Sequence, residues 1–190
     1  ARDRKPYVVF GTAPSMNGYT SLNAAITIQK HKKSLPAQAP IGAFLDLSIL
    51  AAGPVRMIRS GVGDSLCPAT AQAHWLLSHL LVDHPYRTMP FVLLAEDEPE
   101  LFASAEALVN GDLDAMEKLV RTLLLSAFGT AICGHSLPAS QGEHLISHYG
   151  DMLPDPARHF TFHGEQIGVT TLTMARLQGR MLEGPPPVVS

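Results

Sequence analysis

The stretch DLDAMEKLVRTLLLSAFGTAIC, from Asp112 to Cys133, carries the clearest helical pattern in the chain. Asp112 is a good N-cap residue, and apolar side chains recur after it at steps of three and four residues. These steps predict one buried stripe, which consists of Leu113, Met116, Val120, Leu123, Leu124, Ala127, Phe128 and Ala131. The pattern therefore predicts a long helix with one face in the core of a helical bundle.

Further helices are expected on both sides of this one. Two follow it, at about 140–149 and 163–182, and the proline-marked linker LPDPARHF separates them. Before it, Pro54 stands at a first helical position, and the pattern continues through TAQAHWLLSHLL, residues 70–81. Residues 54–190 are thus predicted to form an all-helical domain.

The first 53 residues read as a small β portion. YVVFG, residues 7–11, has the composition of a buried strand that runs into the loop TAPSMNG. Two more extended segments are predicted at 21–28 and 41–47, and the basic turn between them is expected to be a hairpin or a protruding loop. The predicted fold class is α+β overall and mainly α, with domains at 1–53 and 54–190.

Composition excludes several kinds of partner. A net charge of −3 over 190 residues provides no field for a polyanion, and the one basic cluster lies at residues 30–33, so nucleic acid is not expected as a partner. The longest uncharged apolar run, residues 122–134, is too short to span a bilayer, and no signal peptide is visible. Cys67 and Cys133 form no CxxC unit, which indicates reduced, packed thiols in a cytoplasmic protein.

The segment GHSLPASQGEHLISHYGDM, residues 134–152, raises the question of whether its histidines are packed, solvated or bound to a metal. Ser140 and Glu143 match the capping box SxxE, so Glu143 has a purely structural interpretation. His144 then falls in the first turn of the helix, and His148 lies one turn later on the same face. The positive end of a helix favours a neutral imidazole at His144, whose lone pair a cation can bind.

A second histidine and a carboxylate could complete a metal site. His163 begins the next predicted helix beside a glycine that allows close approach, and the linker prolines allow the two helices to converge. Catalytic metals commonly take three protein ligands. The best carboxylate is Asp64 in SGVGDSL, where Gly61 and Gly63 remove side-chain bulk and the motif is expected to interrupt a helix.

Pattern alone favours the simpler alternative. Histidines on helices are more often packed or solvated than bound to a metal, and that interpretation is kept for His31, His74, His79, His84, His135 and His159.

Four motifs together resemble a known family. SGVGDSLC, GHSLPASQGEHLISH, FHGEQIGVTTL and, near the start, YVVFGTAPSMNGYTS occur in the order and spacing of the glycerol-1-phosphate dehydrogenases. These enzymes belong to the superfamily of iron-containing alcohol dehydrogenases, glycerol dehydrogenases and dehydroquinate synthases. The resemblance covers nearly the whole chain. It implies the edge of a Rossmann-like nucleotide-binding domain in residues 1–53 and a helical metal-binding domain of the dehydroquinate synthase-like fold in residues 54–190.

The resemblance also implies site residues and chemistry. One divalent metal is expected, and its three ligands align with Asp64, His144 and His163. The metal could be zinc, nickel or iron. His148 aligns with a second-shell or substrate-contacting residue and is the expected catalytic side chain. The nicotinamide end of NAD or NADP is expected to bind at Thr12, Ser15, Asn17 and Ser21. The implied reaction is hydride transfer between NAD(P)H and dihydroxyacetone phosphate. Apart from the resemblance, apolar stripes whose ends look truncated favour association of chains, so a homo-oligomer is expected.

Three substitutions depart from the family pattern. Asn17 replaces a common aspartate, Leu137 replaces the arginine of an SRPAS motif, and His74 replaces an aspartate before Trp75, a change expected to be structural. Leu137 puts phosphate recognition in doubt and favours an unphosphorylated polyol, glycerol, as the substrate. A dehydroquinate-like lyase reaction is a further alternative within the superfamily.

Two segments of the family pattern are absent from the sequence. The glycine-rich loop that binds the cofactor pyrophosphate would lie upstream of Tyr7, and further helices would follow Leu182. If the chain is complete as given, we expect weak cofactor affinity. The alternative from a different class is then a catalytically silent fragment that folds around a metal or self-associates.

Overall fold

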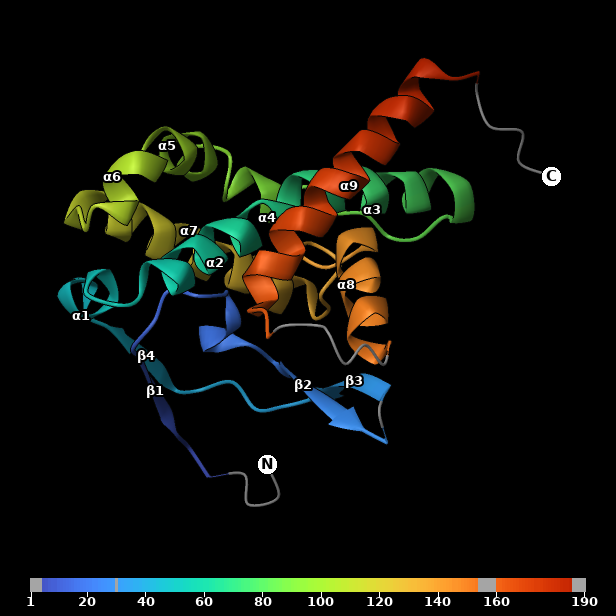
Figure 1. The fold of residues 1–190 in the computed structure, drawn as a ribbon. Helices are drawn as coiled ribbons and strands as arrows, with labels where there is room; N and C mark the ends of the chain where they lie inside the picture. The colour runs from blue at the N-terminus through green and yellow to red at the C-terminus, as the bar shows by residue number, and fades with distance from the viewer. Residues whose placement is uncertain (1–4, 30, 154–159, 186–190) are drawn as a thin grey trace.

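The computed structural model describes residues 5–29, 31–153 and 160–185, and within them a small β layer lies on one side of a helical body (Figure 1). The chain enters at the β layer, and the last helix extends from the far side of the helical body. The fold class predicted from the sequence, mainly α with a small β portion, is confirmed.

The β layer consists of two pairs of strands. β1 (Val8–Gly11) and β4 (Gly42–Leu45) pair in parallel, with Phe10 opposite Phe44. β2 (Asn23–Ile28) and β3 (His31–Pro36) pair antiparallel. The expected hairpin is therefore present, but its second strand is formed by the basic segment that was predicted as a turn. Lys30, part of the basic cluster, lies outside the described residues.

Helix α7 (Leu113–Cys133) is the central element, as predicted, and contacts α1, α2, α4, α5, α6 and the short 3-10 helix η1 (Gly18–Thr20). Asp112 caps it, since Oδ1 accepts the N–H of Ala115 at 2.8 Å. Its C-terminal end is closed by Gly134, whose φ of 74° suits a glycine.

The buried face of α7 differs slightly from the predicted stripe. Met116, Val120, Leu123 and Ala127 are buried as expected, together with Leu119, which was not predicted. Leu113 and Phe128 are instead exposed, at 46% and 44%. Leu113 is the first residue of the helix, and Phe128 lies one residue, about 100°, around the helix from Ala127.

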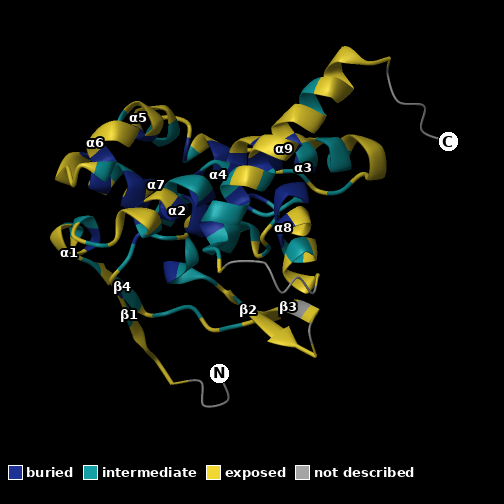
Figure 2. Ribbon diagram, in the orientation of Figure 1, coloured by how far each residue is buried: buried dark blue, intermediate teal, exposed yellow. Residues whose placement is uncertain are grey.

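Six helices precede α7 in the described part of the chain, and all of them except α3, which contacts α2, α8 and α9, pack against it. The six are α1 (Leu47–Ala51), α2 (Val55–Ser65), α3 (Cys67–Val82), α4 (Met89–Val92), α5 (Asp97–Ala103) and α6 (Ala105–Val109). The sequence pattern does not predict the short helices α4 to α6. One apolar cluster joins α1, α2, α5 and α6 to α7 and includes Leu50, Ile58, Leu101, Leu108 and Leu119. Figure 2 shows this buried interior in the helical body, whereas the strands are largely exposed.

Helix α2 corrects the prediction that SGVGDSL interrupts a helix. It continues through both glycines and ends at Ser65. A Cβ at Gly61 would overlap the backbone oxygen of Pro14, and one at Gly63 would overlap that of Gly164 in α9 (His163–Glu183). The glycines therefore serve close packing rather than a break in the helix.

Helix α8 (Gly142–Met152) begins two residues later than predicted. Its N-cap is Gln141, which makes no side-chain capping bond, so the predicted capping box with Ser140 is wrong. Glu143 nevertheless accepts the N–H of Gln141 at 2.7 Å. The linker residues 154–159, including His159, lie outside the described residues.

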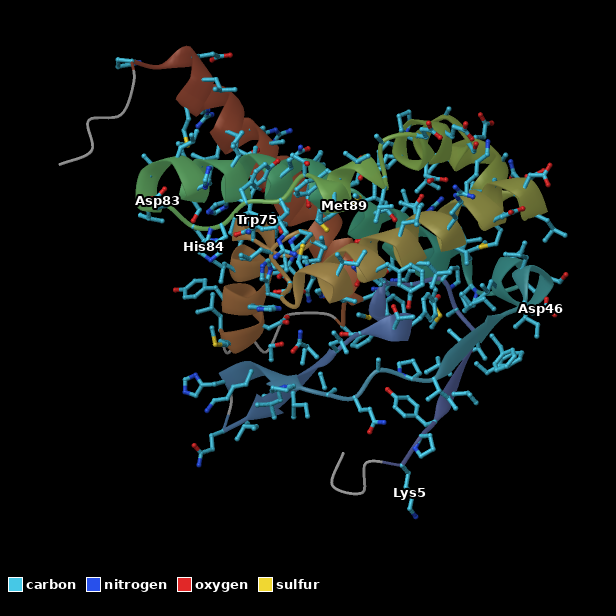
Figure 3. The ribbon with its side chains drawn as sticks, turned by 180° about the vertical axis from the view of Figure 1, so that it is seen from behind. Lys5, Asp46, Trp75, Asp83, His84 and Met89 are labelled. Atoms are coloured by element: carbon cyan, nitrogen blue, oxygen red, sulfur yellow. The ribbon has the colours of Figure 1, made fainter. Side chains whose placement is uncertain are left out.

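Several histidines outside the predicted site pack around Trp75, as expected. The indole Nε1 donates to Nδ1 of His84 at 3.3 Å and to the carbonyl oxygen of Pro85 at 2.9 Å, after the chain turns back at Asp83 (Figure 3). His135 meets the ring of Trp75 edge-on, at 5.3 Å between ring centroids. His31 is exposed on β3, and His74 is half-buried next to Gly142.

Both cysteines are free thiols. Cys67 is buried, and Cys133 is half-buried. Burial raises the pKa of the Cys67 thiol, and the carboxylates of Asp64 and Glu143 raise it further. Among residues 5–29, 31–153 and 160–185, no helix combines the length and apolar character needed to cross a membrane.

Candidate metal centre

Three helices bring Asp64, His144 and His163 together. Asp64 lies near the end of α2, His144 in the first turn of α8, and His163 at the start of α9. One potential ligand atom from each residue lies within 4.8 Å of those of the other two. The packing of α2 against α9 and of α8 against α9 sets this convergence. These are the three residues that both the pattern and the family resemblance selected.

Asp64 is the carboxylate of the cluster and is 2% exposed. Its Oδ2 accepts the backbone N–H of Asn17 at 2.9 Å, and its Oδ1 lies 3.6 Å from Nε2 of His163. Burial raises the pKa of Asp64, although the N–H of Asn17 and the nearby His144 act against this rise. A buried carboxylate beside two imidazoles fits a bound divalent cation, which would compensate its charge.

His144 is held by its neighbour in the sequence. Its Nδ1 lies 3.0 Å from Oε1 of Glu143, a side chain with no exposed surface. Burial alone would raise the pKa of Glu143, but the hydrogen bonds from His144 and from the N–H of Gln141 hold it below its ordinary value. From the sequence alone, Glu143 has only a capping role. Its position directly before a candidate ligand was the available signal.

A pocket of about 550 Å³ is lined by His144 and His163 of the cluster, whereas Asp64 is not among its lining residues. Among the residues predicted to function, Ser15, Asn17, Ser21, His144, His148 and His163 line it. Lys33 and Ser34 of the β2–β3 hairpin also contribute, so the β layer and the helical body share the pocket. Thr12 is exposed and is not among the lining residues.

The loop after β1 is fixed to the helices at this pocket. Nδ2 of Asn17 donates to Oγ of Ser126 in α7 at 3.1 Å, and Oγ of Ser60 in α2 donates to the carbonyl oxygen of Ser15 at 2.9 Å. The amide of Asn17 therefore joins the loop to α7, while its backbone N–H orients Asp64. The hydroxyl of Ser21 bonds nearby backbone, since its Oγ donates to the carbonyl oxygen of Asn23 at 2.7 Å.

His148 lies one turn after His144 on α8. The two rings meet edge-on with centroids 6.0 Å apart, whereas the rings of His144 and His163 are 5.1 Å apart. His148 lines the pocket but does not belong to the three-residue cluster. This arrangement suits contact with a molecule in the pocket.

Sequence comparisons connect this arrangement to known proteins. The family model for iron-containing alcohol dehydrogenase matches residues 1–54. A glycerol-1-phosphate dehydrogenase [NAD(P)+] from Pyrococcus horikoshii is 35% identical over 175 residues, which are 92% of this chain and 49% of that protein. The enzyme of the same name from Bacillus licheniformis is 32% identical over 170 residues, 89% of this chain and 42% of that protein.

Along most of its length the chain is similar to glycerol-1-phosphate dehydrogenases, and its first 54 residues match the iron-containing alcohol dehydrogenase family. The fold agrees, since a probable glycerol dehydrogenase from Sinorhizobium meliloti superposes with a TM-score of 0.75 at 21% identity, over 92% of this chain and 50% of the other. The family's name specifies a metal, and the names of the two relatives specify NAD(P)+. The chain spans less than half the length of these two relatives, at 42% and 49%.

Proposed function

We propose that this chain carries the metal-binding, catalytic part of an NAD(P)-linked glycerol-1-phosphate dehydrogenase, which interconverts dihydroxyacetone phosphate and sn-glycerol 1-phosphate. The observation that carries the proposal is the cluster of Asp64, His144 and His163 beside a pocket shared by the β layer and the helical body. Relatives that are 32% and 35% identical carry the same activity in their names.

Asp64, His144 and His163 are the proposed metal ligands. Two imidazoles and one carboxylate leave a position open for substrate, which is the arrangement of catalytic rather than structural metal sites. The same donors suit zinc, nickel or iron, so the ligand set does not select one of them. A metal held by these residues would supply Lewis-acid polarisation of the substrate carbonyl, and a nicotinamide in the pocket would supply the hydride.

The loop after β1 is the proposed contact for the nicotinamide of NAD or NADP. The pocket is lined by Ser15, Asn17 and Ser21 of this loop. Thr12 directly follows β1 and belongs to the same loop. Asn17 also carries no charge where relatives commonly have aspartate. Because its side chain binds Ser126, the proposed role of Asn17 is to hold the loop in place.

His148 is the proposed catalytic side chain. It lines the pocket one turn from His144, so its imidazole can hydrogen-bond the substrate oxygen that gains or loses a proton. The residue orients substrate without contributing to the metal ligands.

The remaining features of the proposal concern the whole protein. Residues 1–53 would be part of the nucleotide-binding domain and residues 54–190 the helical metal-binding domain. The free thiols of Cys67 and Cys133 favour a cytoplasmic location. For the 190-residue chain itself, the exposed apolar side chains of β1 and β4 favour a homo-oligomer.

One residue favours a second substrate. Leu137 stands where glycerol-1-phosphate dehydrogenases commonly have arginine, and an apolar side chain offers no bond to a phosphate. A glycerol dehydrogenase that acts on the unphosphorylated polyol is therefore the second candidate.

Elemental analysis of the purified chain, followed by an assay, tests these proposals. We expect about one zinc, nickel or iron per chain after loosely bound ions are removed. NADH or NADPH oxidation with dihydroxyacetone phosphate, compared with dihydroxyacetone, then separates the two substrates. A metal without binding or oxidation of either cofactor would identify a silent metal-binding piece, and absence of metal would overturn the proposal.

A further inference from the structure

Glu143 is a buried carboxylate whose Oε1 has two close hydrogen-bond partners. Its Oε1 accepts the N–H of Gln141 at 2.7 Å and faces Nδ1 of His144 at 3.0 Å, while its Oε2 lies 3.5 Å from Oγ1 of Thr70 in α3. The side chain has no exposed surface. An ionised carboxylate in such a place is costly unless each oxygen is satisfied, so its presence calls for a role that an apolar residue could not fill.

Capping of a helix does not require this burial. In α9 the carboxylate of Glu165 accepts the N–H of Phe162 at 2.8 Å and binds Arg56 at the surface. Glu143 makes the corresponding bond to the N–H of Gln141 in α8 but directs the same oxygen at the ring of His144. The difference between the two helix starts is therefore the contact with the imidazole.

This contact determines which nitrogen of His144 carries the proton. A carboxylate accepts hydrogen bonds only, so Nδ1 must carry the proton that faces Glu143. The lone pair of a neutral ring is then on Nε2, the nitrogen that remains for a cation. A metal ligand needs a deprotonated nitrogen held in one orientation, and a carboxylate behind the ring supplies both conditions and increases the basicity of the ligand.

We infer that Glu143 is a positioning residue that fixes the tautomer and ring orientation of His144 for metal binding, an inference that rests on the proposed metal site. It predicts that Glu143→Ala lowers zinc affinity by roughly ten- to a hundredfold. Glu143→Gln keeps an oxygen for Nδ1 but loses the charge, so it should retain the tautomer and lose roughly three- to tenfold in affinity.

The experiment measures zinc affinity by competition with a chelating dye at pH 8 for the full chain and each variant, with circular dichroism to verify folding. Long-range proton–nitrogen spectra of the His144 ring provide a second measurement on the metal-free protein. We expect protonated Nδ1 in the wild type and in Glu143→Gln, and a shift toward protonated Nε2 in Glu143→Ala. A merely structural role would not change the tautomer.

The matched control is Glu165→Gln, which removes the charge of the carboxylate in the first turn of the next helix. The zinc affinity of the Glu165→Gln variant should stay within about threefold of the wild type. Wild-type affinity and an unchanged tautomer in Glu143→Ala would overturn the inference. If Glu143→Ala does not fold, unchanged affinity in Glu143→Gln would overturn it. Absence of zinc binding by the wild type would instead contradict the proposed metal site itself.

Discussion

At the scale of single residues, the candidate site depends on side chains with separate tasks. Asp64 places a buried carboxylate in the cluster, whereas His144 and His163 place imidazoles beside it from two other helices. His148 lines the same pocket without belonging to the cluster. Because a metal bound by three protein ligands loses most of its affinity when one of them is removed, the roles of these histidines can be separated by substitution.

Metal content should distinguish the ligands from His148. In His144→Ala or His163→Ala the bound metal should fall from about one ion per chain to below about a tenth. In His148→Ala the metal should remain, while turnover falls roughly a hundredfold because a hydrogen bond to the reacting oxygen is lost. Elemental analysis measures the metal in the three variants, and the NAD(P)H oxidation assay measures turnover. Full retention of metal in His144→Ala and His163→Ala would contradict the ligand assignment.

Glu98 is an ionisable residue with no role in the proposed reaction. It lies in the first turn of α5, and its Oε1 is buried without a hydrogen-bond partner among the described residues. Burial raises its pKa from 4.5 to about 7. Because the folded state holds the proton more tightly than the unfolded state, this residue's contribution to stability is fully present below pH 4.5 and is lost as the pH rises toward 7.

The substitution Glu98→Gln should remove this pH dependence. The free energy of unfolding of the variant relative to the wild type should increase by roughly 2 kcal/mol between pH 5 and pH 8, since an amide carries no charge to bury. Urea unfolding at both pH values gives this difference, and Glu106→Gln, at an exposed position of α6, is the control. Equal differences at both pH values would show that Glu98 is ionised in the fold without penalty.

At the scale of elements, the contact of α2 with α9 determines the geometry of the site. Gly63 lies directly before Asp64, and a Cβ there would overlap the backbone oxygen of Gly164, directly after His163. Because α2 and α9 touch at these two glycines, the neighbouring residues Asp64 and His163 are held close together. Each glycine within a helix costs about 1 kcal/mol relative to alanine, and close packing offsets this cost.

Gly63→Ala should consequently weaken both the fold and the site. Forcing the helices apart should destabilise the protein by roughly 1–3 kcal/mol and lower zinc affinity, because His163 moves relative to Asp64. Gly179→Ala, in α9 where a Cβ meets nothing within 4 Å, should instead stabilise it by up to about 1 kcal/mol. Thermal unfolding and zinc titration measure both effects, and equal behaviour of the two variants would contradict this account.

The sequence pattern predicted where the long helices begin and end better than it predicted how the elements pack against one another. The periodicity of α7 and its cap at Asp112 identified the helix with its observed start and end, because its own side chains determine both. The glycines of α2 suggested a break, because propensity does not include the packing partner that they admit. The strand β3 was missed because lysines are poor strand formers, and only its pairing with β2 reveals it.

The candidate site was predictable to a similar degree. Histidines at helix starts could be recognised from sequence, and the family motifs selected Asp64 among the carboxylates. The contact of Glu143 with His144, and the bond from Asn17 to Asp64 across 47 positions of sequence, depend on how the elements pack. No local pattern contains that information.

At the scale of the whole molecule, a metal at this site would link α2, α8 and α9. Removing it should lower stability, because a ligand that binds only the folded state contributes RT ln(1 + [L]/Kd), about 2.7 kcal/mol at a hundredfold excess over Kd. We expect a lower unfolding temperature after treatment with a chelator and recovery on adding zinc. Asp64→Asn should show neither change, and a response to the chelator in that variant would place the stabilising metal elsewhere.

The β layer makes a second prediction for the molecule as a whole. β1 and β4 form a parallel pair, an arrangement usually covered on both faces, yet Phe10 and Phe44 are each 57% exposed and Val8 is 55% exposed. Adjacent exposed aromatic side chains of this kind promote association between chains. Sedimentation velocity should therefore show dimers or larger species whose share increases with concentration.

The double substitution Phe10→Ser and Phe44→Ser should shift this equilibrium toward the monomer by roughly tenfold or more, because two large apolar side chains leave the contact. Zinc content should stay unchanged, since neither residue belongs to the Asp64, His144 and His163 cluster. Leu182→Ser is the control, as Leu182 is 87% exposed at the far end of α9. If it reduces association as much as the double substitution does, the contact between chains lies on α9 and not on the β layer.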